Sequence, residues 1–417
     1  MSRRVLISPL GTGSLNKMNT TEREYRPATY RIGDKEYNET FISKALTKHL
    51  DIDTVFLIGT VKSMWEEAYE VYGKGTPHWD EYQWAMLVEQ IEHASADTDP
   101  QSFDLTVLEK VLGDNAKAFV IKYGVNEQEM MENWEHLSHI EEYLQDGDIV
   151  YFDITHAFRS MAFYILSVLN YIIDVSEKKI EVGGVFYGML DIIKETGYAP
   201  IVDLKPLYET FRWSRGAYSF IHHGNGYEVA SLMEATNPHL SMLVNNLSNS
   251  INMNYLNSIK EQTKNLRQHR DDFSELEGPA HYVVPRVINE FLTHFDDKEQ
   301  PYVFQLKASH WYYKKKRYGE AYVALLEALI TFNCFRSPKG GCDSEGSRRW
   351  DDYTFRNPRK NKMHEEKHIF HEVFADLSHI RNCIAHHKME EIGELNKYIE
   401  DYKDYYEKVS GYFKELL

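Results

Sequence analysis

The chain has 417 residues, of which 27% are charged, and its net charge at pH 7 is −17. This length is too great for one ordinary hydrophobic core, so two or three domains are expected. The acidic balance argues against unspecific wrapping of nucleic acid. No apolar run approaches the ~20 residues that cross a bilayer, which argues against a membrane protein. Any contact with RNA or a nucleotide must therefore use local basic sites.

The cysteines and the N-terminus both indicate a cytoplasmic protein. The three cysteines, Cys334, Cys342 and Cys383, show no CxxC spacing and cannot form a fully paired framework, which is typical of a reducing compartment. The opening "MSRRVLISPLGTG" has a basic start, but its apolar stretch is too short for a secretory signal. We therefore interpret this stretch as a first β-strand.

The first 200 residues alternate short apolar runs with helical patterns. Candidate strands or strand–helix units are "RRVLISPL", "DTVFLIGT", "FDLTVLEKVL", "GDIVYFDIT" and "IEVGGVFYGM". Helical spacing appears in "NETFISKALTKHL" and "MAFYILSVLNYIID", and an insert over 66–98 is predicted to be helical and peripheral. This rhythm predicts an α/β, Rossmann-like layer with a mostly parallel sheet.

From about Leu207 onward the strand signals nearly vanish, which predicts an all-helical C-terminal half. Helical patterns lie in "EVASLMEAT", 239–266, "VVPRVINEFLTHF" and "RYGEAYVALLEALITFNCF". Two closing helices are predicted over about 364–388 and 390–417.

Between these helices, residues 336–362 form a basic loop. The loop holds eight Lys or Arg against four Asp or Glu, with Trp350, Tyr353 and Phe355 interleaved. It is either a solvated loop or a surface that tracks the backbone and stacks the bases of single-stranded RNA.

Glycine and threonine follow two predicted strands. Gly11, Thr12 and Gly13 end the first, and Gly59 and Thr60 end the third element. Ligands of open α/β sheets bind at such strand ends through exposed backbone N–H groups. The segment lacks the third glycine of the dinucleotide-binding motif GxGxxG. Tight turns without a ligand would also need glycine, so these residues alone do not show whether a ligand binds here.

The stretch "YFDITHAFRSMAF" is more specific. A buried strand ends at a cluster of Asp153, Thr155, His156 and Arg159, and a helix follows. Asp153 or Thr155 could simply cap that helix. Capping does not require His156 and Arg159, which add a donor and a cation where a phosphate is already favoured. We therefore expect a ligand site here.

Near the C-terminus, "RNCIAHH" places Arg381, Asn382 and His386 on one predicted helix. Imidazole can move protons of a ribose 2'-OH and a leaving 5' oxygen, and guanidinium can stabilise charge on phosphorus, so RNA could be cleaved without a metal. Five residues correspond to about 140° of helix rotation, so one helix does not present Arg381 and His386 as a tight pair. Two copies across a two-fold axis could complete the site. Cys383, Ile384 and Ala385 are interpreted as packing residues.

A zinc-binding alternative is disfavoured. "HEEKH" at 364–368 matches HExxH, with His371 one turn further, but Glu366 and Lys367 occupy positions that are apolar in a buried zinc helix. No metal site is expected.

Two of these motifs resemble known families. "DITHAFR", with "LGTG" and "LIGT", resembles the D-x-T-H-G-x-R signature of CRISPR-associated CARF sensors of cyclic oligoadenylate, except that Ala157 stands where the family has glycine. "RNCIAHH" is similar to the R-x4-H motif of HEPN ribonucleases, and "RYGEAYVALLEAL" to their first helix. The order, sensor first and nuclease last, is that of ancillary ribonucleases of type III CRISPR systems.

The resemblance implies a CARF sensor over 1–204, a helical linker over 205–300 and a HEPN domain over 301–417. It implies a homodimer, or a dimer-based oligomer, with one ring pocket shared by two sensors and a shared Arg381/Asn382/His386 site cutting single-stranded RNA to 2',3'-cyclic phosphate ends. Tetra-adenylate is the favoured activator and hexa-adenylate the next. A functional link to a type III effector complex, without stable binding, is also implied. Carried over by position, the ring-binding residues are Gly11, Thr12, Gly13, Thr60, Asp153, Thr155, His156 and Arg159.

Two other functions stay open. The chain could be a ligand-responsive module that binds RNA or a partner without cleaving it. It could also be a ring nuclease whose sensor degrades its own activator. Ring-stimulated RNA cleavage and the fate of a labelled ring would separate the three functions.

Overall fold

The computed structural model describes residues 2–15, 23–156, 159–336, 368–386 and 392–415, without the side chains of residues 14, 15, 23, 24, 159, 336, 368–370, 386 and 392–394. The chain divides into two compact units, Met1–Tyr208 and Glu209–Leu417. One hydrophobic cluster of the second unit runs from Trp213 to Phe413 and includes residues of both predicted C-terminal parts. The division at 204 and 300 stays a prediction.

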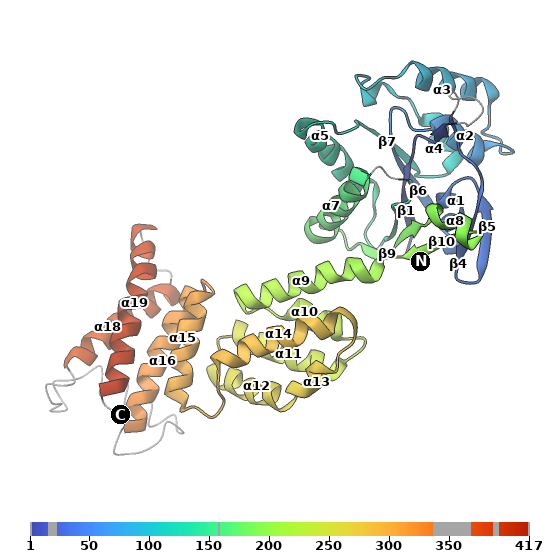
Figure 1. Ribbon diagram of the computed structural model, residues 1–417. Coiled ribbons are helices and arrows are strands. Elements are labelled where there is room, and N and C mark those ends of the chain that lie inside the picture. Colours follow the sequence, from blue (N-terminus) through green and yellow to red (C-terminus); the bar gives the residue numbers. More distant parts are fainter. Residues whose placement is uncertain (1, 16–22, 157–158, 337–367, 387–391, 416–417) are drawn as a thin grey trace. The chain divides into compact units, whose positions relative to one another are not determined.

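An eight-stranded sheet forms the centre of the first unit, in the order β5-β4-β10-β9-β8-β1-β6-β7 (Figure 1). Its strands are β1 Arg4–Leu10, β4 Ala28–Ile32, β5 Lys35–Glu39, β6 Thr54–Thr60, β7 Lys117–Ile121, β8 Ile149–Asp153, β9 Glu181–Gly188 and β10 Ala199–Asp203. Neighbours from β9 to β7 are parallel. The pairs β9–β10 and β4–β5 are antiparallel, while β4 and β10 are parallel. A separate pair joins β2 Ser14–Leu15 to β3 Arg23–Glu24.

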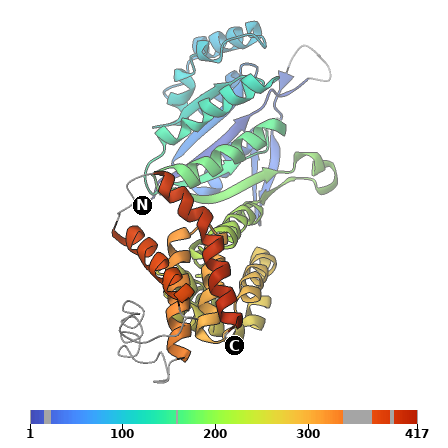
Figure 2. The same ribbon diagram turned by 90° about the vertical axis from the view of Figure 1, so that its left-hand side faces the viewer.

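Helices cover both faces of this sheet. They are α1 Ile42–Leu50, α2 Trp65–Gly73, α3 Glu81–His93, α4 Thr106–Leu112, α5 Glu127–Ser138, α6 Ile140–Tyr143, α7 Arg159–Val175 and α8 Ile193–Thr196, with 3₁₀ turns at Pro100–Ser102 and Leu190–Ile192. Successive residues of β1 point to opposite faces: Val5 and Ile7 pack in the cluster of Ile165 from α7, and Leu6 packs in that of Ile42 from α1. Figure 2 shows α5 and α7 side by side across one face. Strands β1 and β6 are almost uniformly apolar because both of their faces are buried.

The predicted N-terminal elements agree with the structure at β1, β6, β8, β9, α1 and α7, and the insert is helical as α2 and α3. The run "FDLTVLEKVL" is a helix, α4, and contains no strand. Two residues of the predicted first helix, Asn38 and Glu39, belong instead to β5. The strands β4, β5, β7 and β10 were not predicted.

The described residues of the second unit form helices and the turns between them, with no strand, as predicted. Its helices are α9 Lys205–His223, α10 Tyr227–Met233, α11 Pro238–Asn252, α12 Leu256–Gln268, α13 Arg270–Ser274, α14 Gly278–His294, α15 Pro301–Lys314, α16 Tyr318–Arg336, α18 His368–His386 and α19 Ile392–Glu415. Sequence analysis missed α9 as a separate helix and missed α15. Within the described residues, no helix combines the length and the apolar character that a membrane crossing requires.

Candidate functional site

The predicted ligand residues gather where the order of the parallel strands reverses. Strand β1 has β6 on one side and β8 on the other, and all three run parallel. Gly11, Thr12 and Gly13 follow β1, Thr60 ends β6 and Asp153 ends β8, so all of them lie at carboxyl ends of strands. This is the edge at which open α/β sheets bind ligands.

Hydrogen bonds join the loop after β1 to the loop after β6. The Met64 N–H donates to the Gly11 carbonyl at 3.1 Å, and the Ser63 hydroxyl donates to the Leu10 carbonyl at 2.6 Å. The same Ser63 oxygen accepts from the Thr60 N–H at 2.9 Å. The two strand ends therefore form one fixed backbone surface, and sequence analysis had not singled out Ser63.

Asp153 is completely buried and holds the end of β8. Its carboxylate accepts from the Ser8 hydroxyl at 2.6 Å and from the Thr155 N–H at 2.8 Å. Thr155 in turn accepts from the Gly188 N–H through Oγ1, at 2.8 Å. Burial raises the pKa of Asp153 to about 6, although the bonds from Ser8 and Thr155 act in the opposite direction. Both residues thus have structural partners inside the loop.

His156 and Thr60 differ from these two because each carries a buried polar atom to which no described residue bonds. His156 Nε2 and Thr60 Oγ1 have no hydrogen-bond partner among the described residues. Burial lowers the pKa of His156 to about 4, so its ring is neutral at pH 7. Buried polar atoms without a partner call for an explanation, and others occur away from this site, for example at Trp84 and Gln305. Here they lie at the ends of the two strands that flank β1.

Tyr25 is a site residue that no sequence motif marks. Its ring lies 5.1 Å from that of His156 and 4.7 Å from that of Phe41, edge to face in both cases. Its phenol oxygen lies within hydrogen-bonding reach of the backbone of Gly11 and Gly13. A Cβ on Gly11 would come within 2.4 Å of this oxygen, so only glycine fits without a shift. Gly13 has φ +70°, a conformation that favours glycine.

Arg159 is the first residue of α7, and its side chain lies outside the described residues, as does Ala157. The structure therefore brings together the loops of Gly11, Thr60 and His156. It leaves the predicted role of the Arg159 cation as a prediction.

The predicted nuclease residues lie in the last turns of α18. Arg381 Nη1 donates to Asn382 Oδ1 at 3.0 Å, and both side chains are half-buried. Asn382 is 100° from Arg381 and only 40° from His386 around the helix, so this bond draws the guanidinium toward the His386 side. His386 is the last residue of α18, and its side chain lies outside the described residues.

The opposite side of α18 packs on the core. Ile380 and Cys383 are buried, and Ile384 packs against the same cluster, as predicted. Ala385 is exposed, so its interpretation as a packing residue was wrong. A residue not singled out before, His379, is exposed seven positions before His386 and therefore nearly on the same face. Its Nε2 lies 3.5 Å from Cys383 Sγ.

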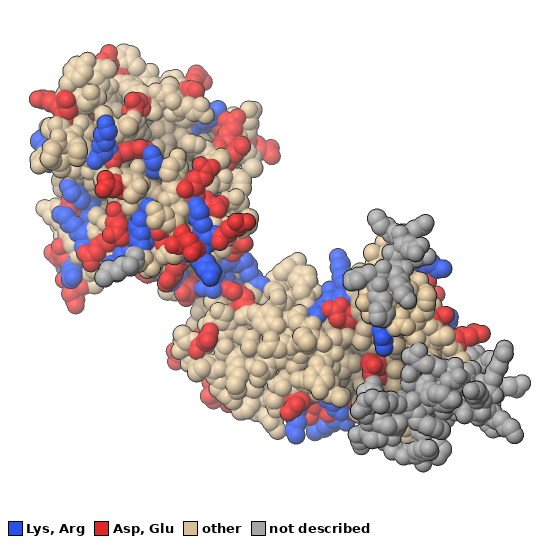
Figure 3. Space-filling model, turned by 180° about the vertical axis from the view of Figure 1, so that it is seen from behind, with Lys and Arg blue, Asp and Glu red and all other residues tan. Residues whose placement is uncertain are grey.

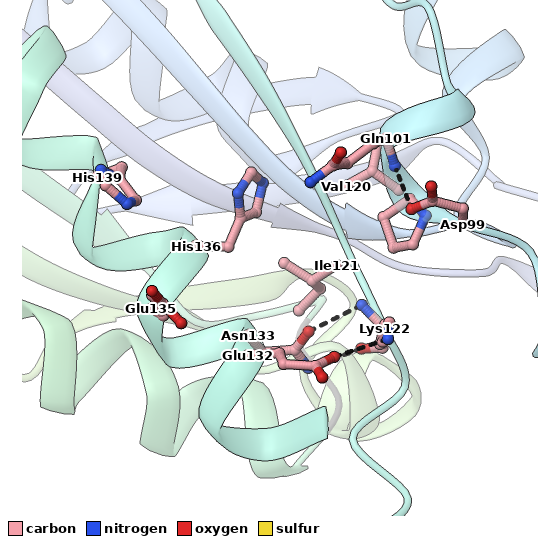
Figure 4. A pocket seen from close by; sticks show the side chains of 11 residues that line it. Asp99, Gln101, Val120, Ile121, Lys122, Glu132, Asn133, Glu135, His136 and His139 are labelled. Atoms are coloured by element: carbon pink, nitrogen blue, oxygen red, sulfur yellow. Dashed lines mark hydrogen bonds and ion pairs between the residues drawn. The ribbon is translucent and has the colours of Figure 1, made fainter. Parts of the chain in front are cut away.

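A separate pocket of about 410 Å³ lies beside the end of β7 (Figure 4). It contains none of the predicted ligand residues. Asn133 binds the Lys122 backbone in both directions at 2.9 Å, and Lys122 Nζ pairs with Glu132 at 2.7 Å. The polar groups at this end of the pocket are satisfied by one another, which fits a structural role better than a ligand site.

Two predictions fall on residues outside the description. They are the basic loop 336–362, apart from the backbone of residue 336, and the HExxH match at 364–368, of which only the backbone of His368 is described. Among the described residues, no group of His, Cys, Asp and Glu is placed to hold a metal ion.

Comparison with known proteins adds family information. Residues 5–191 match the family model of the CARF domain of the CRISPR system endoribonuclease Csx1, and residues 209–300 match that of the second domain of CRISPR-associated protein MJ1674. The chain is 30% identical over 408 residues to CRISPR-associated protein MJ1674 of Methanocaldococcus jannaschii. The match covers 94% of this chain and 63% of that protein, so the chain spans less than two thirds of its relative's length.

A solved structure, Enterococcus italicus Csm6 bound to cyclic hexa-2'-fluoro-hexa-dAMP, is 12% identical and covers 98% of this chain and 94% of that chain at a TM-score of 0.38. A likeness at this score carries no argument about this chain. The CARF resemblance is confirmed by the family model. The HEPN resemblance stays a prediction.

Proposed function

Because residues 5–191 carry a domain of the CARF family of CRISPR-associated proteins, we propose that the chain is a ribonuclease of type III CRISPR immunity that cyclic oligoadenylate activates. The first unit binds the ring, and the end of α18 cleaves single-stranded RNA. The proposal places the protein in the cytoplasm as a homodimer, or a dimer-based oligomer, that responds to the effector complex through the ring and does not bind it stably. Tetra-adenylate is the preferred ring, followed by hexa-adenylate.

One observation carries the sensor half of this proposal. Thr60 Oγ1 and His156 Nε2 are buried without partners among the described residues, at strand ends that flank the Gly11–Gly13 loop. A ring of adenylates offers phosphate oxygens to the loop N–H groups, and donors and acceptors on its sugars and bases to the two free atoms. The start of α7 adds the positive end of a helix dipole for a phosphate. Asp153 and Thr155 hold the loop that presents His156.

The nuclease half rests on the chemistry of Arg381, Asn382 and His386. The imidazole of His386 takes the proton of the ribose 2'-OH, and the 2' oxygen attacks phosphorus. The bond to the 5' oxygen then breaks as a His386 imidazolium of the shared site gives that oxygen a proton. Arg381 stabilises the charge that builds on phosphorus, and Asn382 orients the guanidinium. The products are a 2',3'-cyclic phosphate and a 5'-OH, and no step needs a metal. Two copies of α18 supply the shared site.

Activation requires that the ring bind one arrangement of the dimer more tightly than another, since a ligand shifts an equilibrium only by its differential affinity. The test compares RNA cleavage with and without cyclic tetra-adenylate. Arg381→Ala and His386→Ala are expected to lower the stimulated rate by about 10²–10⁴-fold while ring binding is retained. Thr60→Val is expected to weaken ring binding about tenfold, since one hydrogen bond is lost.

Glu372→Ala is the matched control, because Glu372 is exposed on the same helix and lies outside the proposed site. Cleavage that survives in the Arg381→Ala, His386→Ala double variant would refute the nuclease assignment. RNA retention without any stimulated cleavage would favour a binding module. Loss of labelled ring in the His386→Ala variant would reveal a ring nuclease.

A further inference from the structure

The second unit contains a long segment without charge. Residues 235–259 include no Asp, Glu, Lys or Arg, whereas a stretch of 25 residues at the chain's 27% would hold about seven. Much of this segment is on the surface, because Met242, Met253 and Tyr255 are 49%, 80% and 63% exposed. Figure 3 shows a broad face of the second unit with few charged side chains. Surfaces depleted of charge and rich in Met and Tyr are typical of protein interfaces.

The exposed part of this segment forms a defined surface, which we call the uncharged strip. It comprises the exposed residues of α11 beyond its first turn and of the corner after it, together with one tyrosine of α10: Tyr227, Met242, Asn249, Asn252, Met253 and Tyr255. Positions 242, 249 and 253 fall within about 40° of one another around a helix. The opposite side of α11 is core, including Val244, Leu247 and Ile251.

Hydrogen bonds fix the strip. The Tyr227 hydroxyl donates to Asn249 Oδ1 at 3.0 Å and accepts from Asn252 Nδ2 at 3.3 Å. Asn254 turns the chain with φ +49°, and its Nδ2 donates to the Glu320 carbonyl at 3.4 Å. Met253 and Tyr255 are therefore held outward on either side of an anchored residue. Their exposure is built into the fold.

The chemistry of the strip selects its partner. RNA is a poor fit, because the strip offers no cation to the phosphates. A strongly charged protein is also a poor fit, because the strip offers it no opposite charge. Asparagine amides both donate and accept hydrogen bonds, so the same side chain from a second copy can pair with them across a two-fold axis. Two chains that each carry −17 repel one another least through a surface without charge.

We propose that the uncharged strip is a contact surface between two copies of this chain related by a two-fold axis. This assignment goes beyond the proposed function, which requires apposed copies of α18 but makes no use of α11. A two-fold contact brings positions beside its axis next to their own copies, and the proposal puts the axis at Asn249. A charge placed there therefore meets the same charge of the second copy. The sign of that charge then has no influence on the outcome.

The experiment uses this symmetry in the full chain. Asn249→Lys and Asn249→Asp are each expected to raise the dissociation constant of one step in the self-association of the chain about a hundredfold. Sedimentation velocity over a range of concentrations measures this constant. An equimolar mixture of the two variants pairs Lys with Asp and is expected to restore the mass of the wild type. Tyr282→Lys and Tyr282→Asp are matched controls, since Tyr282 is 77% exposed on α14 and lies outside the strip.

Other outcomes overturn the proposal. An unchanged mass of the assembly in both Asn249 variants would show that the strip is not a contact between copies. An unchanged mass with a changed frictional ratio would indicate that the strip contacts the first unit of its own chain instead. Loss with only one sign of charge, or no rescue in the mixture, would indicate an asymmetric contact. Ring binding measured on the same samples keeps this result separate from the proposed function.

Discussion

At the scale of single residues, the sensor site combines two titrating groups whose pKa values are displaced in opposite directions. Burial raises the pKa of Asp153 from 3.8 to about 6 and lowers that of His156 from 6.5 to about 4. Between pH 4 and 6 the folded protein keeps a proton on Asp153 that the unfolded chain releases, so acidification through this range stabilises the fold. His156 acts in the opposite direction, because the unfolded chain gains its proton first.

Each displacement corresponds to roughly 3 kcal/mol, and in the wild type the two nearly cancel. Asp153→Asn leaves only His156, so its free energy of unfolding should fall by roughly 3 kcal/mol more than that of the wild type between pH 7 and pH 4. The free energy of unfolding of His156→Gln should instead rise by a similar amount relative to that of the wild type between pH 7 and pH 4. Urea unfolding at both pH values measures each difference. Equal pH dependence in all three proteins would contradict the assignment.

The residues of this site were only partly predictable. One short motif at the end of a strand contains Asp153, Thr155 and His156, so these residues can be found from the sequence alone. Ser8, Tyr25 and Ser63 reach the site through contacts across the fold. No spacing in the sequence encodes those contacts, because they depend on the neighbours that β1 acquires in the sheet.

At the scale of elements, the same distinction between local and tertiary causes applies. The strands that were predicted are apolar because the sheet is covered on both faces. The β4–β5 hairpin was missed because it lies at the edge of the sheet, where β5 is largely exposed and polar. The only local sign of the hairpin is its turn at Gly33, which has φ +56°. Helix α15 was missed because it places aromatic residues on several sides, so its sequence shows no clear helical period.

Helix α19 gives a prediction at this scale, because buried tyrosines hold it in the second unit. Tyr402 is 1% exposed, and its hydroxyl lies 2.6 Å from Ser309 Oγ, which donates to the Ala321 carbonyl. Tyr402→Phe leaves the Ser309 oxygen without its donor. We expect the free energy of unfolding to fall by about 1–2 kcal/mol in chemical denaturation.

Tyr405→Phe is the control for this change. Tyr405 lies on the same helix, but its bond to Asp376 is long, at 3.2 Å, and exposed. Its loss is expected to cost below about 0.5 kcal/mol. Equal losses in the two variants would contradict the idea that burial makes the Tyr402 bond important.

At the scale of the whole molecule, the chain holds separate cores. Three clusters surround the sheet of the first unit, and the last of their residues in the chain is Tyr208. The cluster of the second unit begins at Trp213. Sequence analysis anticipated the change from α/β to helical structure near residue 207, because the apolar period itself changes there. It could not anticipate that residues 213–413 would share one cluster, since that depends on how the helices pack.

Separate cores predict two unfolding transitions in calorimetry of the full chain, and the proposed function predicts which one each perturbation moves. Cyclic tetra-adenylate at 100 times its dissociation constant should stabilise only the first unit, by about 2.7 kcal/mol, because the ring binds its folded form alone. Tyr402→Phe should lower only the other transition. Thr60→Val, which weakens ring binding about tenfold, should reduce the ring's stabilisation to about 1.4 kcal/mol. It should leave the second transition in place, because the Thr60 hydroxyl is buried in the first unit. A single transition that ring and Tyr402→Phe both displace would mean that the two units unfold as one body.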